Sequence, residues 1–179
     1  KFNLKPDEGF MGEGNPQKGD YGSYVQSERL EIYHTFAKRL VELGRAFPCF
    51  CGVSESKADI LKRREEQLEE TGNIEEKDPC RNLDFATIEL NIKMGKPWAL
   101  KLLSKGDPNK TFKFTDLIKG ERDIHENAKD IVLVKSNGIP SYGLAHIVDD
   151  TLMHVTTVIR GEEWWSSLNS HLELFDAFG

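Results

Sequence analysis

The chain has 179 residues and a net charge of −6, because 30 acidic side chains outnumber 24 basic ones. This length suits one domain, or one domain with an insertion. With 38% hydrophobic residues, 15 Gly, 7 Pro and 3 Cys, the composition excludes a mainly disordered, collagen-like or disulfide-stapled chain. The longest aliphatic run, Ile131 to Val134, is too short to span a membrane, and no signal peptide is visible. We therefore expect a cytoplasmic protein without membrane attachment, whose thiols are free or metal-bound.

Basic side chains are concentrated in one stretch of this acidic chain. Between Asn91 and Gly120 there are seven Lys and two Asp, a local charge of +5, while the remainder carries −11. The total charge argues against a protein held to nucleic acid by its overall field. A local basic face can still contact phosphates, although solvated lysines on outer strand faces are the commoner explanation.

The first half of the chain reads mainly as helices after an irregular, Gly-rich stretch over residues 1–20. Ser23-Tyr24-Val25-Gln26 matches a capping box, and apolar residues from Leu30 to Val41 then follow a helical spacing that Gly44 ends. Two more helices are predicted, a mostly charged surface helix at 54–72 and another at about 83–94. Between the first two lies a short apolar segment, 46–51, interrupted by Pro48.

Strand patterns begin after Gly95. Residues 98–102 and 112–114 alternate in polarity, 131–135 is rich in β-branched residues, and Asn137-Gly138 is typical of a tight hairpin turn.

Helical patterns return near the end of the chain, at 144–153 and again from Ser166. The β-branched run Val155 to Ile159 between them is predicted to be a buried parallel strand. The sequence thus indicates an α/β fold. Because one strand cannot form a parallel sheet, either other strands escape detection or the sheet extends outside this chain.

The three cysteines, Cys49, Cys51 and Cys80, invite a metal-site interpretation, since thiolates bind zinc well. A closed structural site needs four ligands, and no His lies near Cys80. Buried thiols without a metal are the alternative.

A second group of polar residues follows the predicted strand. Arg160 stands at its carboxyl end, where open α/β sheets bind ligands, and a guanidinium can hold a carboxylate through two parallel hydrogen bonds. Pairing of Arg160 with a nearby glutamate is the alternative. Trp164 can stack on a flat base or pack in the core. Tyr142, His146 and Asp149 share helical spacing, so we expect them on one side of a helix, with Tyr142 and His146 able to line a polar pocket.

Three segments carry a resemblance to a known family. Residues 21–30, YGSYVQSERL, and residues 48–51, PCFC, resemble the "GPYxQSERL" and "CFC" segments of bacterial glutamyl-tRNA synthetases. Residues 131–164, IVLVKSNGIPSYGLAHIVDDTLMHVTTVIRGEEW, resemble a long block of the same family. The matches are in order and cover nearly the whole chain.

The resemblance implies an internal segment of a class I aminoacyl-tRNA synthetase catalytic domain. The expected fold is part of a Rossmann-like nucleotide-binding fold that is interrupted by an α+β connective, acceptor-binding insertion. On that plan, residues 1–45 end the first half of the nucleotide fold, 46–140 form the insertion and 141–179 begin the second half. A chain that opens on Lys1 rather than Met agrees with this expectation.

The family reaction joins glutamate to ATP, with Mg²⁺, and transfers it to the 3′ end of tRNA(Glu). The resemblance implies that Arg160 binds the side-chain carboxylate of glutamate, that Tyr142 and His146 line the same pocket, and that Glu163 and Trp164 lie near ATP. The parent enzyme is expected to be a monomer. Two ATP signatures of class I synthetases, the HIGH and KMSKS motifs, are absent from these 179 residues, so the chain alone is expected to be inactive.

Zinc-binding members of the family have a fourth ligand two residues beyond the third Cys. Asn82 occupies that position, so Cys49, Cys51 and Cys80 are expected to form an incomplete zinc site. The alternatives to a glutamate–tRNA ligase segment are a glutaminyl-specific synthetase, the glutamyl-queuosine tRNA synthetase, and a stand-alone tRNA-binding or metal-binding module.

Overall fold

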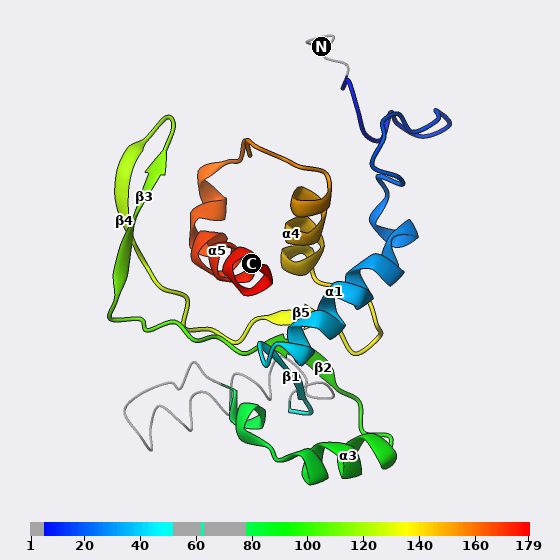
Figure 1. The fold of residues 1–179 in the computed structure, drawn as a ribbon, viewed down its shortest axis with the longest axis vertical. Coiled ribbons are helices and arrows are strands. Elements are labelled where there is room, and N and C mark those ends of the chain that lie inside the picture. The colour runs from blue at the N-terminus through cyan, green and yellow to red at the C-terminus, as the bar shows by residue number, and fades with distance from the viewer. Residues whose placement is uncertain (1–5, 52–61, 63–77) are drawn as a thin grey trace.

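The fold is a mixed α/β arrangement around a three-stranded antiparallel sheet (Figure 1). The computed structural model describes residues 6–51, 62 and 78–179. The predicted helix at 54–72 lies outside the described residues, except for Lys62, which is helical.

The sheet has the strand order β1-β2-β5, with β1 at Ala46–Cys49, β2 at Ala99–Leu102 and β5 at Val132–Val134. Pro48 lies in β1, an edge strand, where a residue without an N–H is tolerated. Phe47 pairs with Lys101 and Ala46 with Leu102. Because side chains alternate along a strand, the first pair lies on one face of the sheet and the second on the other.

Three helices cover one face of the sheet: α1 at Leu30–Glu42, α4 at Tyr142–Leu152 and α5 at Trp165–Phe178. Gly44, with φ +64°, ends α1: its N–H donates to the Val41 carbonyl, and the Arg45 N–H donates to the Leu40 carbonyl. The helices and strands share one hydrophobic core, whose members are Tyr33, Ala37, Leu40, Ala46, Leu100, Leu102, Leu133, Leu144, Ala145, Ile147, Val148, Leu174 and Ala177.

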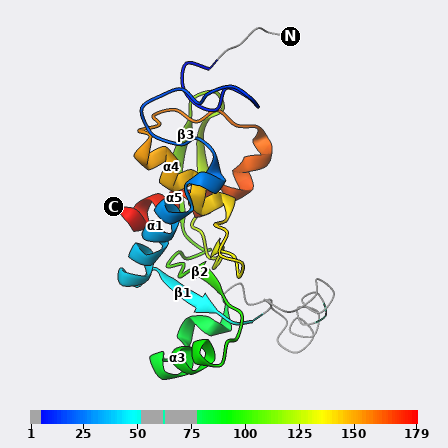
Figure 2. The same cartoon turned by 90° about the vertical axis from the view of Figure 1, so that its right-hand side faces the viewer.

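The opposite face carries a much smaller core of Phe47, Cys49 and Cys80. A short 3-10 helix, η2 at Pro79–Asn82, packs against β1 there and leads into α3 at Phe85–Lys93. Asp84 caps α3, because its carboxylate accepts a hydrogen bond from the Thr87 N–H at 2.7 Å. Viewed from the side, α3 lies at one end of the molecule and the N-terminal segment at the other (Figure 2).

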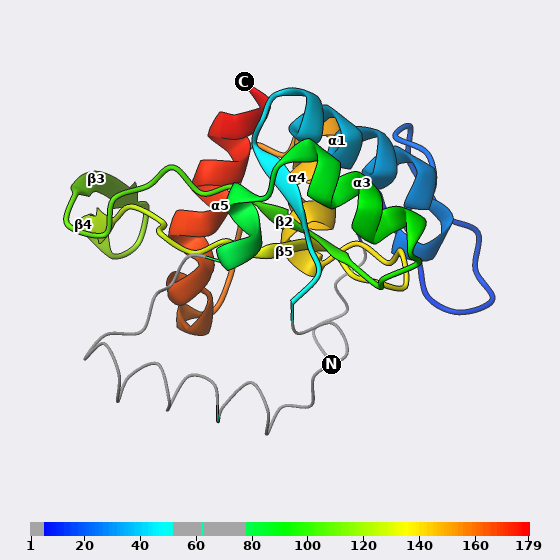
Figure 3. The same ribbon diagram turned by 90° about the horizontal axis from the view of Figure 1, so that it is seen from below.

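The remaining strands form a hairpin, β3 at Thr111–Asp116 and β4 at Gly120–His125, that projects beside α5 (Figures 1 and 3). It contacts the start of α5 through Trp165, whose ring meets Phe114 edge-on at 6.1 Å. The Arg122 guanidinium lies 5.2 Å from the same indole. The turn is held by Asp116, which accepts hydrogen bonds from the Ile118 and Lys119 N–H groups.

Two sequence predictions about local structure are wrong. The capping box does not form: α1 begins only at Leu30, and Gln26 donates to the Pro140 carbonyl instead of reaching back to Ser23. The segment Val155 to Ile159 is not a strand, and Ile159 is 91% exposed. In the part of the chain that the structure describes, no strand lies beside this segment to pair with it.

The other elements near the sheet agree with the sequence. The Asn137-Gly138 turn is present, with Gly138 at φ +80° and Val134 bridged to Pro140. Among the described helices, none is long and apolar enough to cross a membrane.

Candidate functional site

The first turns of α4 present two aromatic side chains toward the segment that leads into α5. The Ser141 hydroxyl caps α4 by accepting a hydrogen bond from the Leu144 N–H at 3.3 Å. Because Tyr142 and His146 are four residues apart, their rings stack on the same side of the helix, with centroids 5.6 Å apart. The sequence-based pairing of these two residues is confirmed.

The Arg160 guanidinium is in contact with three rings, those of Tyr142, His146 and Trp164. Its Nη2 donates to the Tyr142 hydroxyl at 3.0 Å and lies 3.0 Å from each ring nitrogen of His146. The guanidinium is also 5.5 Å from the centre of the Tyr142 ring and 5.0 Å from that of Trp164. None of the carboxylates in the described residues forms an ion pair with Arg160, so the predicted alternative, pairing with a neighbouring glutamate, is not observed.

His146 is uncharged in this environment. Burial, and after it the positive charge of Arg160, lower the pKa of His146 to about 4. The neighbouring His171, edge-on to His146 at 4.8 Å, has its pKa lowered to about 4, first by burial and then by His146 and Arg160. A neutral imidazole keeps a free lone pair, and it can therefore accept a hydrogen bond from the guanidinium.

One carboxylate lies behind His146. Asp150 Oδ2 is 2.9 Å from His146 Nδ1, but the contact lacks hydrogen-bond geometry, and this buried oxygen has no hydrogen-bond partner. Burial raises the pKa of Asp150. The direct partners of Arg160 are therefore aromatic rings and the His146 imidazole, and no carboxylate of the described residues forms an ion pair with it.

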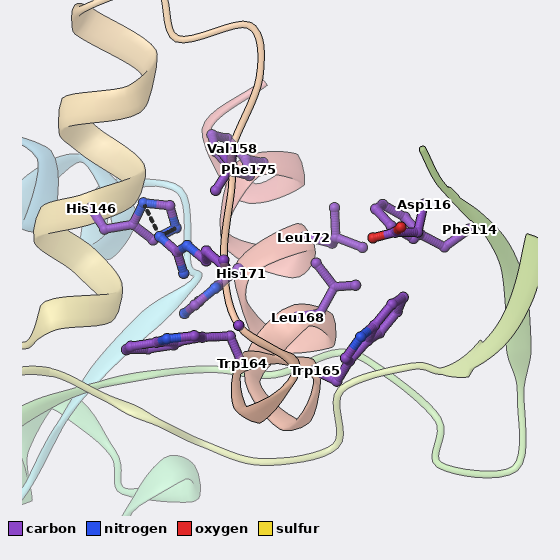
Figure 4. A pocket seen from close by; sticks show the side chains of 12 residues that line it. Phe114, Asp116, His146, Val158, Trp164, Trp165, Leu168, His171, Leu172 and Phe175 are labelled. Carbon is purple, nitrogen blue, oxygen red and sulfur yellow. Dashed lines mark hydrogen bonds between the residues drawn. The ribbon is translucent and has the colours of Figure 1, made fainter. Parts of the chain in front are cut away.

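A cavity of about 260 Å³ adjoins Arg160 (Figure 4). His146 and Trp164 border one end, and Phe114 and Asp116 of the hairpin border the other. Between them lie apolar side chains of α5, among them Leu168 and Leu172. The cavity thus has a cationic group at one end, a carboxylate at the other and apolar walls between them, so an anionic group of a small ligand would be held at the Arg160 end.

The structure brings together four of the five residues predicted for substrate binding: Tyr142, His146, Arg160 and Trp164. Glu163 does not line the cavity; its carboxylate folds over Gly161, where a β-carbon would collide with it.

Asp149 has the helical spacing that places it on the same side of α4 as Tyr142 and His146, but its carboxylate is bound by partners outside the Arg160 contacts. It accepts hydrogen bonds from Arg29 Nε at 2.9 Å and from the Tyr33 hydroxyl at 2.7 Å. This buried network joins the segment before α1 to α4, so Asp149 has a structural role.

The sequence interpretation missed the other half of the cavity. His171 and Leu168 come from α5, where they read as ordinary core residues, and Asp116 comes from a hairpin turn distant in sequence. The only signal was the spacing of Trp165, Leu168 and Leu172 along one helix face.

The three cysteines meet on the opposite face of the sheet, and Asp78 joins them. One donor atom from each of Cys49, Cys51, Asp78 and Cys80 lies within 4.8 Å of the others. Cys49 Sγ is 3.0 Å from Asp78 Oδ2, and Cys51 Sγ is 2.9 Å from Cys80 Sγ. The position expected to hold a fourth ligand is Asn82, but the structure offers Asp78 instead.

Charges around the cysteine cluster favour an anionic carboxylate. Burial opposes ionisation of Asp78, but hydrogen bonds from the Cys49 thiol and the Lys101 ammonium lower its pKa below the usual value. Burial raises the pKa of Cys51 to about 11 and also raises that of Cys49. Three thiols and one carboxylate are a donor set that fits a tetrahedral zinc ion.

The basic stretch is largely neutralised in the structure. Four of its seven lysines form ion pairs with carboxylates of the described residues. The pairs are Lys93 with Glu89, Lys101 with Asp78, Lys113 with Glu121, and Lys119 with Glu162. The local charge of +5 therefore overstates the basic surface available to phosphates.

Known proteins match this chain over nearly its entire length. Residues 3–179 match the family described as tRNA synthetases class I (E and Q), catalytic domain. A glutamate–tRNA ligase of Acetivibrio thermocellus is 45% identical over 99% of this chain, and one of Clostridium beijerinckii is 43% identical over 99%. The chain spans only 32% of the length of each relative.

Solved structures show a similar fold. The crystal structure of a glutamate tRNA ligase from Elizabethkingia meningosepticum, in complex with its amino acid, has a TM-score of 0.74 and 28% identity. The match covers 90% of this chain and 32% of that one. A glutamate-tRNA synthetase from Elizabethkingia anophelis matches with the same TM-score and identity.

Proposed function

This chain belongs to the catalytic-domain family of class I tRNA synthetases for glutamate and glutamine, and from that premise we propose that it is a segment of a cytoplasmic glutamate–tRNA ligase. The ligase activates glutamate with ATP and Mg²⁺, giving glutamyl-adenylate and pyrophosphate, and then transfers glutamate to the 3′ end of tRNA(Glu). The parent enzyme acts as a monomer. A zinc ion at the cysteine cluster completes the proposal.

Arg160 is the observation on which the proposal depends most. A guanidinium that is framed by aromatic rings and a neutral His146, without an ion-paired carboxylate among the described residues, suits the side-chain carboxylate of glutamate. The amide of glutamine offers no negative charge to such a group. This favours glutamate over glutamine within a family that includes both specificities.

The other site residues have supporting roles. Tyr142 and His146 orient the guanidinium through its Nη2, so they position the glutamate carboxylate. Trp164 lines the cavity and, with Glu163, is proposed to face ATP. Residues 46–140 are proposed as the insertion that holds the acceptor end of tRNA, with 1–45 and 141–179 as parts of the nucleotide fold. Contact with RNA phosphates is expected from the three lysines of the 91–120 stretch that lie outside the four ion pairs described above, Lys96, Lys105 and Lys110.

The test compares Arg160→Gln with Arg160→Lys in the ligase that contains this segment. Arg160→Gln should lower kcat/KM for glutamate about a thousandfold, the equivalent of about 4 kcal/mol, because a desolvated charge pair loses one partner. Arg160→Lys should recover only part of this, since an ammonium lacks the planar fork. The KM for ATP should change little. Arg39→Gln, an exposed arginine on α1, is the matched control.

A second measurement addresses the 179-residue chain itself. Neither of the two phosphate-binding signatures of class I synthetases is present in it, so nothing stabilises the charge that develops on the phosphates. We expect the purified chain to show no glutamate-dependent exchange of pyrophosphate into ATP. Exchange above the level of a glutamate-free control would contradict this expectation.

A further inference from the structure

We propose that Asp78 is the fourth protein ligand of a zinc ion bound by Cys49, Cys51 and Cys80, in place of the residue two positions after the third cysteine. This rests on the proposed zinc site and is independent of the proposed ligase activity. The donor atoms of these four residues all lie within 4.8 Å of one another. Zinc with bonds of about 2.3 Å to sulfur separates its ligands by about 3.5–4 Å, a spacing that small side-chain rotations reach.

The two oxygens of Asp78 have separate partners. Oδ1 accepts a hydrogen bond from the Cys80 N–H at 2.8 Å, so it caps η2. Oδ2 faces Cys49 Sγ at 3.0 Å and contacts the Lys101 ammonium. Oδ2 is therefore the atom available to the metal, while Oδ1 keeps the carboxylate in place.

A hydrogen bond to Asp130 holds Asp78 in this orientation. The Asp78 N–H donates to Asp130 Oδ2 at 2.9 Å, and the other oxygen of Asp130 accepts from the Ser104 N–H at 3.0 Å. The Asp130 side chain is 1% exposed and also pairs with Arg81. Outer partners of this kind fix metal ligands before the ion binds. Asn82, by contrast, is exposed, and an amide is not among the usual ligands of zinc.

Lys101 balances the charge of the site. Three thiolates and one carboxylate carry four negative charges, of which Zn²⁺ neutralises two. The ammonium of Lys101, on the same face of the sheet as Cys49, supplies a third positive charge. Binding releases the three thiol protons to water, so no oxidant or reductant takes part.

The experiment measures zinc content and zinc affinity of the reduced 179-residue chain by elemental analysis and competition with a chromophoric chelator. Wild type should hold about one zinc per chain. Asp78→Asn keeps an oxygen for the Cys80 N–H but loses the charge, and it should bind zinc about 10- to 100-fold more weakly. Asn82→Ala is the matched control and should bind like wild type.

Asp78→Cys makes the test independent of how well Asp78→Asn folds. With four thiolates it should retain the metal, and the Co²⁺-substituted variant should gain roughly one third in thiolate-to-cobalt charge-transfer absorbance over wild type, as three sulfur ligands become four. Equal affinity in wild type and Asp78→Asn, or an unchanged Co²⁺ spectrum in Asp78→Cys, overturns the role of Asp78 but leaves a cysteine site. A wild-type chain without stoichiometric zinc overturns both. Neither outcome bears on ligase activity.

Discussion

The two faces of the β1-β2-β5 sheet are stabilised in different ways. Among the described residues, the face under α1, α4 and α5 (the large face) buries thirteen core residues, whereas the opposite face (the small face) buries three. The smaller face adds ion pairs and sulfur contacts, among them Lys101–Asp78, Arg81–Asp130 and the close approach of Cys51 to Cys80. Where the described residues bury little apolar surface, polar bonds contribute more of the stabilisation, and the proposed zinc ion would add to them.

The two proposed sites follow the same division. The Arg160 pocket, formed by Tyr142, His146, Arg160 and Trp164 with the adjoining cavity, is built from α4, the start of α5 and the segment between them. The cysteine cluster lies on the small face, where binding of the proposed zinc ion should be coupled to folding. A perturbation of one face should therefore affect that face more than the other.

The largest effect is expected from a cavity in the large core. Leu102, on the central strand β2, is fully buried. Leu102→Ala should lower the free energy of unfolding by about 3 kcal/mol, through lost burial and the cavity left behind. Urea denaturation of the zinc-loaded chain measures it. Leu117→Ala, at an 88% exposed position on the hairpin turn, should change stability by less than about 0.5 kcal/mol.

The second largest loss of stability should come from removing the proposed zinc ion, and it should loosen mainly the elements of the small face. At a free zinc concentration about a hundred times the dissociation constant, binding stabilises the folded chain by about 2.7 kcal/mol. A chelator should remove this amount in wild type and much less in Asp78→Asn. Hydrogen exchange should locate the loosening at β1 and η2. Equal loosening of α4 and α5 would refute the division between the faces.

The sequence predicted the large face better than the small one. The apolar spacing of α1, its end at Gly44 and the alternation in β2 are confirmed, and so is the placement of Tyr142 and His146 on one side of α4. These features depend on local periodicity or on a family pattern.

The misses share a physical cause, because each depends on partners distant in the chain. Strand β4, with Ile124 its only apolar residue apart from Gly120, exists through pairing with β3. Val155 to Ile159 has strand-like residues but pairs with none of the described strands. Asp78 is an ordinary acidic residue in the sequence, and only the fold brings it to Cys49.

Lowering the pH should reduce the stability of the large face, because two buried histidines, His146 and His171, favour the uncharged form in the folded chain. In the folded chain the pKa values of His146 and His171 are about 4, below the usual 6.5 of an unfolded chain. Between these values only the unfolded chain binds the protons, so the stabilisation is complete above pH 6.5 and is lost as the pH falls toward 4. The pKa difference sets an upper limit of about 3 kcal/mol for each ring, and because solvent screens part of the interaction the measured loss should be on the order of 1 kcal/mol.

The same two imidazoles give the measurement. NMR titration of their ring protons in the folded chain should show no protonation at pH 6, and His146→Asn should flatten the dependence of stability on pH between 6.5 and 4. A midpoint near 6.5 for both rings would contradict the expected burial of uncharged histidine beside Arg160.

The smallest effect should come from a single hydroxyl of the Arg160 pocket. Tyr142→Phe keeps the ring that stacks on His146 and faces the guanidinium, but it removes the acceptor that lies 3.0 Å from Arg160 Nη2. One neutral hydrogen bond is worth about 1 kcal/mol, so KM for glutamate in the ligase should rise about fivefold, while KM for ATP and the zinc content stay unchanged. Tyr21→Phe, outside the pocket, is the control. A fall in kcat with KM unchanged would mean that the hydroxyl acts in the reaction itself and does not position Arg160, because a group that only orients the binding cation affects substrate affinity first.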